Sequence, residues 1–596
     1  MNWSEELFTS LLWIAKSLAI TSLVFSLILY FLTKTTRWGH QFWLLAQSYL
    51  SPRRSLIPLS YFWVIVFFNL LSVRLDILFS HWYKSMYDAL QEMNVPGFWQ
   101  QMIVFSLLAA VHVFNVLLTY YISQHFKIKW RIWLNNEMLD KWSANQSYYK
   151  TQYLENQLDN PDQRIQQDID AYISNSLTFA TGVISSTVSL VAFTIILWDL
   201  SGPIEIMGYE IPHMMVFLVF IYVLVSSVIA FRIGLPLIQL NFTNERLNAN
   251  YRYSLIRLKE YAESIAFYRG ENMEKSMLLR QFDKVIANLW QIIYRTLKLS
   301  GFNLVVSQVS VIFPFIIQAA RYFAGQIKLG DLIQTSQAFG KVQSALSFYR
   351  NSYDDFAAYR AVLDRLTGFH SAVQAANQPS KTHIEPHASS VIFENLDINT
   401  PDGNTLIKNL NLTLEQGSSL LIQGKSGVGK TTLLRTAAGL WPYSEGKIYR
   451  PQQETLFLAQ KAYLPQGRLI DALYYPELAP ADVETDKLNY ILQQVHLAHL
   501  IDKLEIENDW TRVLSLGEQQ RLAFARVLLH KPKVVFLDEA TSSMDEGLED
   551  AMYRLLLAKL PCTTLISVGH RSTLHKHHQQ YLQINSDKSW QITDRT

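Results

Sequence analysis

The first two-thirds of the chain alternates long apolar runs with polar connections. Six of these runs approach the length of about 20 residues that a helix needs to cross a bilayer. They span approximately Leu11 to Leu32, Leu59 to Ser80, Met102 to Ile122, Leu177 to Trp198, Met214 to Leu235 and Leu304 to Tyr322. A seventh stretch, about Asp331 to Tyr349, is less apolar. Its glutamines Gln334, Gln337 and Gln343 are costly against lipid, so if this stretch spans the membrane we expect it to line a cavity or an interface.

Basic residues set the expected orientation of these runs. The connection after the first run carries only positive charges, from Lys34, Arg37, Arg53 and Arg54. The N-terminal tail instead has Glu5 and Glu6, and the loop DLSGPIEIMGYEI has only acids. Because positively charged loops stay in the cytoplasm, we expect the basic connection inside and the tail and acidic loop outside. The acidic tail lacks the positive start of a signal peptide, so the first run is expected to be a retained anchor.

Two polar connections are much longer than the others, at about 123–175 and 236–301. Both fall on the cytoplasmic side in this orientation. In the second, Leu247, Tyr251, Leu255 and Leu258 recur at near-helical spacing among charged residues. Each connection therefore predicts helices that extend beyond the bilayer. They are either a solvated helical hairpin or a pair of extended helices whose turns contact a cytoplasmic partner.

The last third of the chain has a different pattern. Residues 371–389 lose apolar periodicity and gain proline, serine and histidine, which is typical of a linker. After them, short β-rich runs such as VIFENL, SSLLIQG and KVVFLDE alternate with helix-like stretches, the pattern of an α/β domain. We therefore expect an α-helical transmembrane domain over 1–370 and an α/β domain over 390–596.

Composition narrows the class of protein. A chain of 596 residues is too long for one hydrophobic core, and its charged fraction of 17% lies below the roughly 25% of soluble proteins. The formal net charge of +2 argues against a nucleic-acid binder. The single cysteine, Cys562, excludes an internal disulfide framework. Of the classes of protein considered, composition therefore favours a multi-pass membrane protein embedded in a lipid bilayer.

The strongest chemical motif is GKSGVGKTT, which follows the run SSLLIQ and precedes the helix-like TLLRTAAGL. Its glycine, four residues, glycine, lysine and threonine have the spacing of a P-loop. Glycines let the backbone turn so that its N–H groups face phosphate oxygens, and the next helix adds its dipole. We expect Lys430 to neutralise the β- and γ-phosphates of ATP and Thr431 to bind Mg²⁺. The predicted nucleotide-binding residues are Gly424, Lys425, Ser426, Gly427, Val428, Gly429, Lys430, Thr431 and Thr432.

Two acids follow about a hundred residues later, at the end of the apolar run KVVFLDE. A buried strand ending in Asp538 delivers a carboxylate to the edge of the P-loop, suited to holding Mg²⁺ directly or through water. Glu539 is then placed to act on the attacking water as a general base. A strand ending in two acids is common by itself, and its combination with the P-loop makes the site specific.

The chain resembles the ATP-binding cassette (ABC) family in further motifs. LSLGEQQR precedes LAFARVLL, and Gln466 in AYLPQG, Asp545 in SSMDE and His570 in SVGH occur in family order. Taken alone, these three are ordinary as a surface amide, a helix cap and a histidine at a strand end. The resemblance implies that Gln466 joins the metal to the membrane domain and that Asp545 lies at a dimer seam. It further implies that His570, Ser515 and Gly517 stabilise the charge of the γ-phosphate, and that Glu518 belongs to the same nucleotide-binding stretch.

The resemblance extends over most of the chain. NPDQRIQQDI, RYSLIRLKEYAESIAFYRG, QTSQAFGKVQSALSFY and GLWPYSEGKI look like the branch that includes peroxisomal fatty-acyl half-transporters and bacterial SbmA/BacA-like proteins. This resemblance implies an exporter-like domain of six core membrane helices, preceded here by an extra N-terminal helix. It also implies a homodimer, because one chain has one membrane domain and one ATPase domain. The long connections become coupling loops, with Glu263 in the second one.

Two features depart from the family pattern. The aromatic residue on which many family members stack adenine is missing from DINTPDGNTLI, and Leu516 occupies a glycine position of the signature. A residue with a Cβ cannot adopt a positive φ cheaply, so Leu516 is tolerable only where its neighbours make the phosphate contacts. These departures motivate an alternative: a nucleotide-gated membrane scaffold or regulator with low ATP turnover. Glu539 and His570 argue against it, since a chain without hydrolysis needs neither.

The sequence thus predicts an ATP-driven half-transporter that acts as a homodimer in the bacterial inner membrane, with its ATPase domain in the cytoplasm. The expected solute is peptide-, cobalamin- or fatty-acyl-like. ATP would lie between the P-loop of one copy and LSLGEQQR of the other.

Overall fold

The computed structural model describes residues 3–51, 55–154, 160–206, 209–378 and 381–595. It divides into a helical unit, Met1–Asp140 with Asn160–His370, and an α/β unit, Lys141–Asp159 with Ser371–Thr596. Arg53 and Arg54, which contributed to the expected orientation, lie outside the described residues. Each unit is described separately below.

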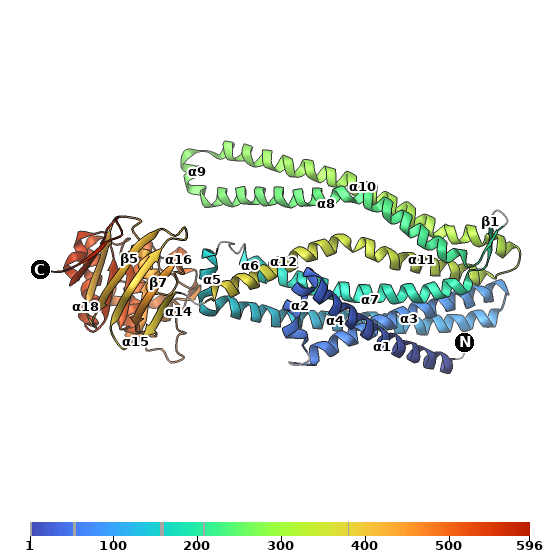
Figure 1. The fold of residues 1–596 in the computed structure, drawn as a ribbon, viewed down its shortest axis with the longest axis horizontal. Coiled ribbons are helices and arrows are strands. Elements are labelled where there is room, and N and C mark those ends of the chain that lie inside the picture. Colours follow the sequence, from blue (N-terminus) through green and yellow to red (C-terminus); the bar gives the residue numbers. More distant parts are fainter. Residues whose placement is uncertain (1–2, 52–54, 155–159, 207–208, 379–380, 596) are drawn as a thin grey trace. The chain divides into compact units, whose positions relative to one another are not determined.

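The helical unit consists of long helices that contain all seven predicted runs (Figure 1). Its helices are α1 (Trp3–Thr35), α2 (Arg37–Leu50), α3 (Ile57–Gln91), α4 (Val95–Ser143), α6 (Pro161–Gln163), the π-helical turn η3 (Arg164–Asp168), α7 (Ile169–Leu200), α8 (Met214–Glu260), α9 (Ala262–Tyr268), α10 (Glu271–Phe323), α11 (Leu329–Asn351) and α12 (Tyr353–Ala376). Two short antiparallel strands, β1 (Ile204–Ile206) and β2 (Tyr209–Ile211), lie in the acidic loop. Within the described residues, six helical segments are long and apolar enough to cross a membrane, and α11 is not one of them.

The polar helix α11 packs against α3 through paired side chains. Lys341 Nζ lies 2.6 Å from Asp76 Oδ2, and Lys84 Nζ lies 2.7 Å from Asp331 Oδ1. Gln334 is buried, and its amide Nε2 lies 3.2 Å from Nδ1 of His81. The expectation that this stretch lines an interface is confirmed for Gln334, because a neighbouring helix satisfies its amide instead of lipid.

Both long connections contain helix, as their sequence pattern predicts. Helix α8 continues to Glu260 and α10 begins at Glu271; the two form an antiparallel hairpin with α9 at its tip (Figure 1). In the other connection, the buried carboxylate of Asp168 accepts hydrogen bonds from two arginines: from Arg164 Nη1 at 2.9 Å, and from Arg365 Nε at 2.8 Å and Nη2 at 2.6 Å. This buried ion cluster ties the start of α7 to α12.

Two sheets form the α/β unit. The six-stranded sheet has the order β14-β13-β6-β12-β11-β8, in which only β14 is antiparallel to its neighbour, and the four-stranded sheet has the order β3-β7-β4-β5. The strands are β3 (Thr382–Pro386), β4 (Val391–Asn399), β5 (Thr405–Leu414), β6 (Ser419–Gly424), β7 (Ser444–Arg450), β8 (Thr455–Leu458), β9 (Gly467–Arg468), β10 (Glu507–Asn508), β11 (Val534–Asp538), β12 (Thr564–Val568), β13 (Gln580–Ile584) and β14 (Trp590–Asp594). The parallel core explains the continuous apolar runs of β6, β11 and β12, since helices and the other sheet cover both faces.

The segment 371–389, predicted to be a linker, is only partly irregular. Helix α12 continues through it to Ala376, and Thr382–Pro386 forms β3, which pairs in parallel with β7. The local sequence of β3 has little strand character, and its conformation depends on hydrogen bonds to a strand about sixty residues later. The expected linker thus contributes a helix end and an edge strand.

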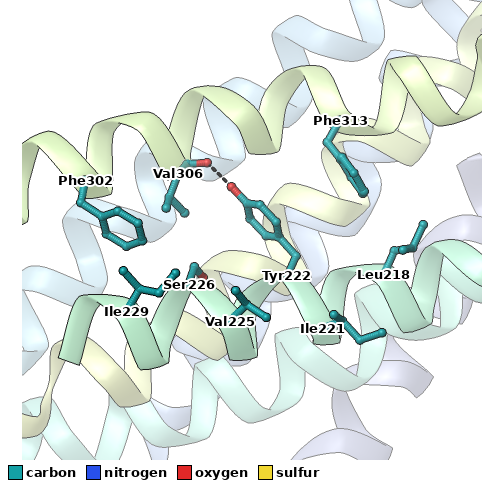
Figure 2. Close-up of a pocket in the computed structure, with 9 residues that line it drawn as sticks. All are labelled: Leu218, Ile221, Tyr222, Val225, Ser226, Ile229, Phe302, Val306 and Phe313. Carbon is teal, nitrogen blue, oxygen red and sulfur yellow. Dashed lines mark hydrogen bonds between the residues drawn. The ribbon is translucent and has the colours of Figure 1, made fainter. Parts of the chain in front are cut away.

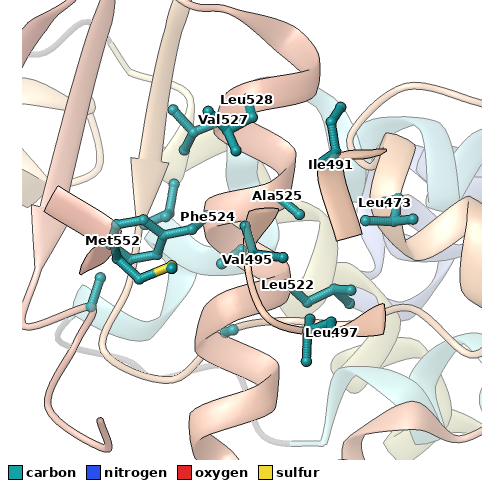
Figure 3. Packing of buried hydrophobic residues seen from close by; sticks show 14 of the residues in the cluster. Leu473, Ile491, Val495, Leu497, Leu522, Phe524, Ala525, Val527, Leu528 and Met552 are labelled. Atoms are coloured by element: carbon teal, nitrogen blue, oxygen red, sulfur yellow. The ribbon is translucent and has the colours of Figure 1, made fainter. Parts of the chain in front are cut away.

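The helices of the α/β unit cover the large sheet and pack on one another. They are η1 (Ala144–Gln146), α5 (Ser147–Lys150), η2 (Thr151–Tyr153), α13 (Lys430–Ala437), α14 (Leu469–Tyr474), α15 (Thr485–Gln494), η4 (Ala498–Lys503), α16 (Trp510–Val513), α17 (Leu516–His530), α18 (Glu546–Lys559) and η5 (Ser572–His577). Figure 3 shows that Leu522, Phe524 and Val527 of α17 lie within a cluster that includes Val495 and Met552. Burial of this apolar face fixes α17, the helix that the signature-like stretch begins.

A buried histidine lies beneath the large sheet of the α/β unit. The ring of His578 is hydrogen-bonded on both sides, with Nδ1 2.9 Å from the carbonyl of Leu574 and Nε2 2.8 Å from Oγ of Ser567. Tyr553 donates a further hydrogen bond of 3.2 Å to Ser567. Burial lowers the pKa of His578 from its ordinary 6.5 to about 4, so the imidazole is neutral in the folded protein at neutral pH.

Candidate functional site

The P-loop is the turn between β6 and α13. Gly424 has a φ of 145° and Gly429 a φ of 104°, values that L-residues with a Cβ rarely adopt. A Cβ at Gly424 would also collide with the carbonyl of Ile584 on the adjacent strand β13. The Nζ of Lys430 folds onto the loop, donating to the carbonyls of Gly424 at 2.9 Å and Lys425 at 3.0 Å. The loop therefore has a curled backbone with a cation at its centre.

Lys430 and the acid opposite it are both partly desolvated. Burial lowers the pKa of Lys430, while the nearby carboxylates of Glu539 and Asp538 act in the other direction. Burial raises the pKa of Asp538, opposed by a hydrogen bond from Thr431 and by the charges of Arg435 and Lys430. The hydroxyl of Thr431 donates to Asp538 Oδ1 at 3.0 Å. The structure thus brings together the two predicted metal-binding residues that are farthest apart in sequence.

Glu539 lies where three strand ends meet. Its backbone has a φ of 48°, and its N–H donates to the carbonyl of Val568 at 3.1 Å. Its carboxylate accepts a hydrogen bond of 3.0 Å from Nε2 of Gln460, and Nε2 of His570 lies 3.4 Å from Oε1. Gln460 follows β8, Glu539 follows β11 and His570 follows β12. The carboxyl ends of parallel strands share one edge of a sheet, which is the usual position of a ligand site in such folds.

Comparisons with known proteins identify the family of the chain. Residues 45–323 match the family model described as ABC transporter transmembrane region 2, and residues 407–542 match the model described as ABC transporter. An uncharacterized ABC transporter ATP-binding protein of Haemophilus influenzae is 59% identical over 99% of this chain and 100% of its own length. The chain belongs to the ABC transporters. It is a multi-pass membrane protein whose α/β unit binds ATP and hydrolyses it in a reaction coupled to transport.

More distant relatives cover most of this ABC transporter as well. The inner membrane ABC transporter ATP-binding protein YddA of Escherichia coli is 32% identical over 84% of this chain and 89% of its own length. The human lysosomal cobalamin transporter ABCD4 is 27% identical over 78% of this chain and 81% of its own length. The shared architecture is therefore a membrane region fused to an ATPase domain.

The signature-like stretch of the transporter begins a helix through a capping box. Ser515 is the N-cap of α17, and its hydroxyl accepts from the N–H of Glu518 at 3.4 Å. The carboxylate of Glu518 accepts in return from the N–H of Ser515 at 2.9 Å and from its hydroxyl at 2.8 Å. His499 Nε2 lies 2.9 Å from the other oxygen of Glu518. These contacts occupy the N–H groups of Ser515 and Glu518 and fix the start of α17 at an exposed position, where the helix dipole favours negative charge.

Leu516 does not have the backbone conformation that made it suspect. It is the first residue of α17, it is absent from the positions with positive φ, and its side chain is exposed. Gly517 is the position at which space is short, because a Cβ there would lie 3.0 Å from the carbonyl oxygen of Ser543. The glycine requirement in this stretch thus belongs to Gly517, and Leu516 satisfies ordinary helical geometry.

The structure places a second glutamine, Gln460, beside Glu539. Gln466 is exposed on the loop just before β9, whose Gly467 pairs with Asn508. Gln460, the second residue after β8, donates to the carboxylate of Glu539, whereas Gln466 was expected to join the metal to the membrane domain. The physical reason is the strand end: β8 stops at Leu458, so Gln460 is carried to the edge where β11 delivers Glu539. The side chain of Gln466 has no hydrogen-bond partner among those found in the described residues, and its predicted role at the metal stays a prediction.

Asp545 and two further side chains organise the segment after Glu539. Asp545 caps α18, since its carboxylate accepts from the N–H of Leu548 at 2.8 Å. Gln520, buried in α17, donates to the carbonyl of Gln460 at 3.0 Å and accepts from the N–H of Ser543 at 3.0 Å. Arg571 donates to the carbonyl of Met544 at 2.8 Å. Sequence reasoning missed Gln520 although it lies inside LSLGEQQR, because its partners come from distant loops.

The donor set fits a nucleotide with Mg²⁺. Hydroxyl and carboxylate oxygens, as at Thr431 and Asp538, are the hard ligands that Mg²⁺ prefers, with phosphate and water completing its shell. Among the described residues, no cluster of three or more His, Cys, Asp or Glu side chains forms a metal site made of protein alone. The remaining P-loop positions, Ser426, Gly427, Val428 and Thr432, lie on the loop or in the first turn of α13.

Proposed function

We propose that two copies of this chain form the working transporter, with each ATP held between the P-loop of one copy and the LSLGEQQR stretch of the other. Lys430 neutralises phosphate charge and Glu539 activates water, oriented by Gln460 and His570. Thr431 and Asp538 hold Mg²⁺, which neutralises the phosphate oxygens when bound. Ser515, Gly517 and Glu518 act on the partner's nucleotide, and Asp545 lies near the seam between the copies.

The observation that carries this proposal is the position of the first cytoplasmic connection. The described residues 141–154 group with the α/β unit and not with the helical unit. The ring of Tyr153 packs on Trp441 with a centroid distance of 4.9 Å, and the hydroxyl of Tyr443 donates to the carbonyl of Tyr153. A membrane-domain loop is therefore seated on the ATPase domain about ten residues after the P-loop, where it is able to transmit movement.

The second cytoplasmic connection exposes aromatic side chains at its tip. Its tip, α9, exposes large aromatic side chains, with Phe267 80% and Tyr268 87% exposed, and Glu263 is exposed beside them. These aromatic side chains leave apolar surface in water, which burial at an interface would remove. Tyrosine and phenylalanine are enriched among the anchors of protein interfaces. We infer that α9 docks on the ATPase domain of the second copy.

The proposed setting is a bacterial inner membrane, with the solute peptide-, cobalamin- or fatty-acyl-like. YddA, named as an inner membrane protein, and ABCD4, named as a cobalamin transporter, support this range. Between α8 and α10 lies an apolar groove of about 370 Å³, crossed by the hydrogen bond from Tyr222 to the carbonyl of Val306 (Figure 2).

Complementation between two inactive variants tests the shared site. Lys430→Ala disables the P-loop of one copy, and Ser515→Phe blocks the signature of the other. Each variant alone should release almost no phosphate from ATP. A mixed dimer, purified through a different tag on each copy, has one intact composite site and should recover about half of the wild-type rate if the sites act independently.

Two controls make the result decisive. A dimer carrying both changes in the same copy and none in the other also retains one P-loop and one signature, but these belong to the same chain and cannot meet. It should stay inactive. Equal activity in the two arrangements, or no recovery in the first, would overturn the shared site while leaving ATP hydrolysis itself unaffected.

A further inference from the structure

The N-terminal helix α1 leaves a cavity between itself and the rest of the helical unit. The cavity has a volume of about 710 Å³, within the roughly 300–1,000 Å³ of small-molecule sites. It is enclosed by residues of α1, α2, α3, α4 and α7. The corner between α1 and α2 is fixed, because Thr36 accepts from the N–H of Gly39 at 3.1 Å and a Cβ at Gly39 would collide with the carbonyl of Leu32.

The lining of this cavity is amphipathic. Eight of its nineteen residues are Phe, Tyr or Trp, and among them Phe25, Phe62 and Trp63 lie together on α1 and the start of α3. Among the described residues of the lining, Lys34 and His40 are the basic groups and no carboxylate is present. Such a wall suits a molecule with an apolar tail and an anionic head. Neighbouring Arg37 is not free for this purpose, since its Nη2 lies 3.1 Å from Asp364.

A buried polar atom beside the cavity also lacks a partner. Trp130 is 2% exposed, and among the described residues its indole Nε1 has no hydrogen-bond partner. A buried N–H donor without an acceptor costs about 1–3 kcal/mol. Because Nε1 itself has almost no accessible surface, a ligand in the cavity would supply the missing acceptor only after a shift of the Trp130 ring.

The cavity lies at one level of the predicted membrane domain. Lys34 comes just after the first apolar run and Phe62 just after the start of the second, while Phe126 follows the third and Ser176 precedes the fourth. By the positive-inside rule this level is the cytoplasmic boundary of the bilayer. Basic pockets between helices on that side are typical sites for anionic lipid head groups, and aromatic rings are typical of the interface.

We propose that this cavity binds an anionic phospholipid of the cytoplasmic leaflet, with its phosphate at Lys34 and an acyl chain between Phe25, Phe62 and Trp63. The lipid fills the space between α1 and the core and fixes the anchor helix to the transporter. Because α2 lines the cavity and Gln41 of α2 donates to Asp364 of α12 at 2.8 Å, the bound lipid supports the contact between α2 and α12.

Brominated phospholipids test this proposal on the full-length protein in vesicles, because bromine on an acyl chain quenches tryptophan on contact. Brominated phosphatidylglycerol, added as a minor component to phosphatidylcholine vesicles, should quench more strongly than brominated phosphatidylcholine. The difference should shrink in Trp63→Phe. In Lys34→Gln, the apparent affinity for phosphatidylglycerol should fall about fivefold, the effect of one lysine at a membrane surface.

Two matched variants separate the site from general electrostatics. Lys16→Gln removes a charge from the same helix α1 at a position outside the lining and should leave the preference intact, as should Lys34→Arg, which keeps the charge. Equal quenching by the two lipids in the wild type would overturn the proposal and favour an occupant chosen without regard to its head group, such as a transported solute. Equal loss in Lys34→Gln and Lys16→Gln would overturn it as well. If Lys34→Gln does not fold, the comparison of the two lipids in the wild type and in Trp63→Phe decides alone.

Discussion

The glutamine at the edge of the large sheet gives the sharpest prediction. Gln460 donates a hydrogen bond of 3.0 Å to the carboxylate of Glu539, the proposed general base. Hydrogen bonds to charged groups contribute about 1.5–3 kcal/mol, which corresponds to about 10- to 150-fold in rate if the contact is kept in the transition state. Because Gln460 is exposed, water competes for the same oxygen, and we expect the lower part of this range. Gln460→Ala should therefore lower the kcat of ATP hydrolysis about 10- to 30-fold.

The assay is phosphate release by purified protein in lipid, measured over a range of ATP and Mg²⁺ concentrations. Gln466→Ala is the matched control: it removes the same side chain at an exposed position of the following loop, and its kcat should stay within about twofold of the wild type. The backbone at residue 460 remains held by the amide of Gln520, so Gln460→Ala should leave Tm unchanged. A large loss in Gln466→Ala with a small one in Gln460→Ala would refute the assignment.

Three other changes test the packing of both units and the signature. Asp168→Asn leaves two arginines without their buried carboxylate and should cost about 3–5 kcal/mol, seen as a lower Tm in detergent, whereas Asp170→Asn breaks an exposed pair and should cost about 1 kcal/mol or less. His578 has a depressed pKa when folded, so the unfolded chain binds more protons between pH 6.5 and 4. Stability should be lost as pH falls through this window, by up to about 1.4 kcal/mol per pH unit, and His578→Gln should lose less. Leu516→Gly should not raise ATP turnover, because residue 516 is already helical; a severalfold gain would show that the signature needs a glycine there.

Hydropathy predicts the helical unit well because a spanning helix makes its backbone hydrogen bonds within its own segment, and that segment must be apolar. The run near residue 331 is the informative exception. Its polarity obscures it in sequence, yet it forms α11, since Gln334, Asp331 and Lys341 find partners on α3. Such pairing depends on which helix lies alongside, and that information is absent from any single segment. The strand β3 was missed for the same reason.

In the candidate site, too, some residues follow from short sequence motifs and one depends on the tertiary structure. The P-loop and the two acids are found from sequence because their chemistry is concentrated in short stretches that begin or end one strand. Gln460 is not found in this way, because its identification requires knowing that β8 ends at Leu458. The motif AYLPQG offers a second glutamine, Gln466, six positions later. The run TLFL before Ala459 was the available signal, as it marks the strand whose end carries the functional side chain.

Gln520 connects these separate motifs physically. One buried amide on α17 holds the carbonyl of Gln460 and the hydroxyl of Ser542 through its nitrogen, and the N–H of Ser543 through its oxygen. The loops after β8 and β11 are thus fastened to the helix whose first residues form the signature. Any force that a second copy exerts on Ser515 therefore reaches the residues around Glu539 through one rigid helix rather than through flexible loops. This linkage gives a physical reason why closure of a dimer and hydrolysis of ATP would be coupled in this chain.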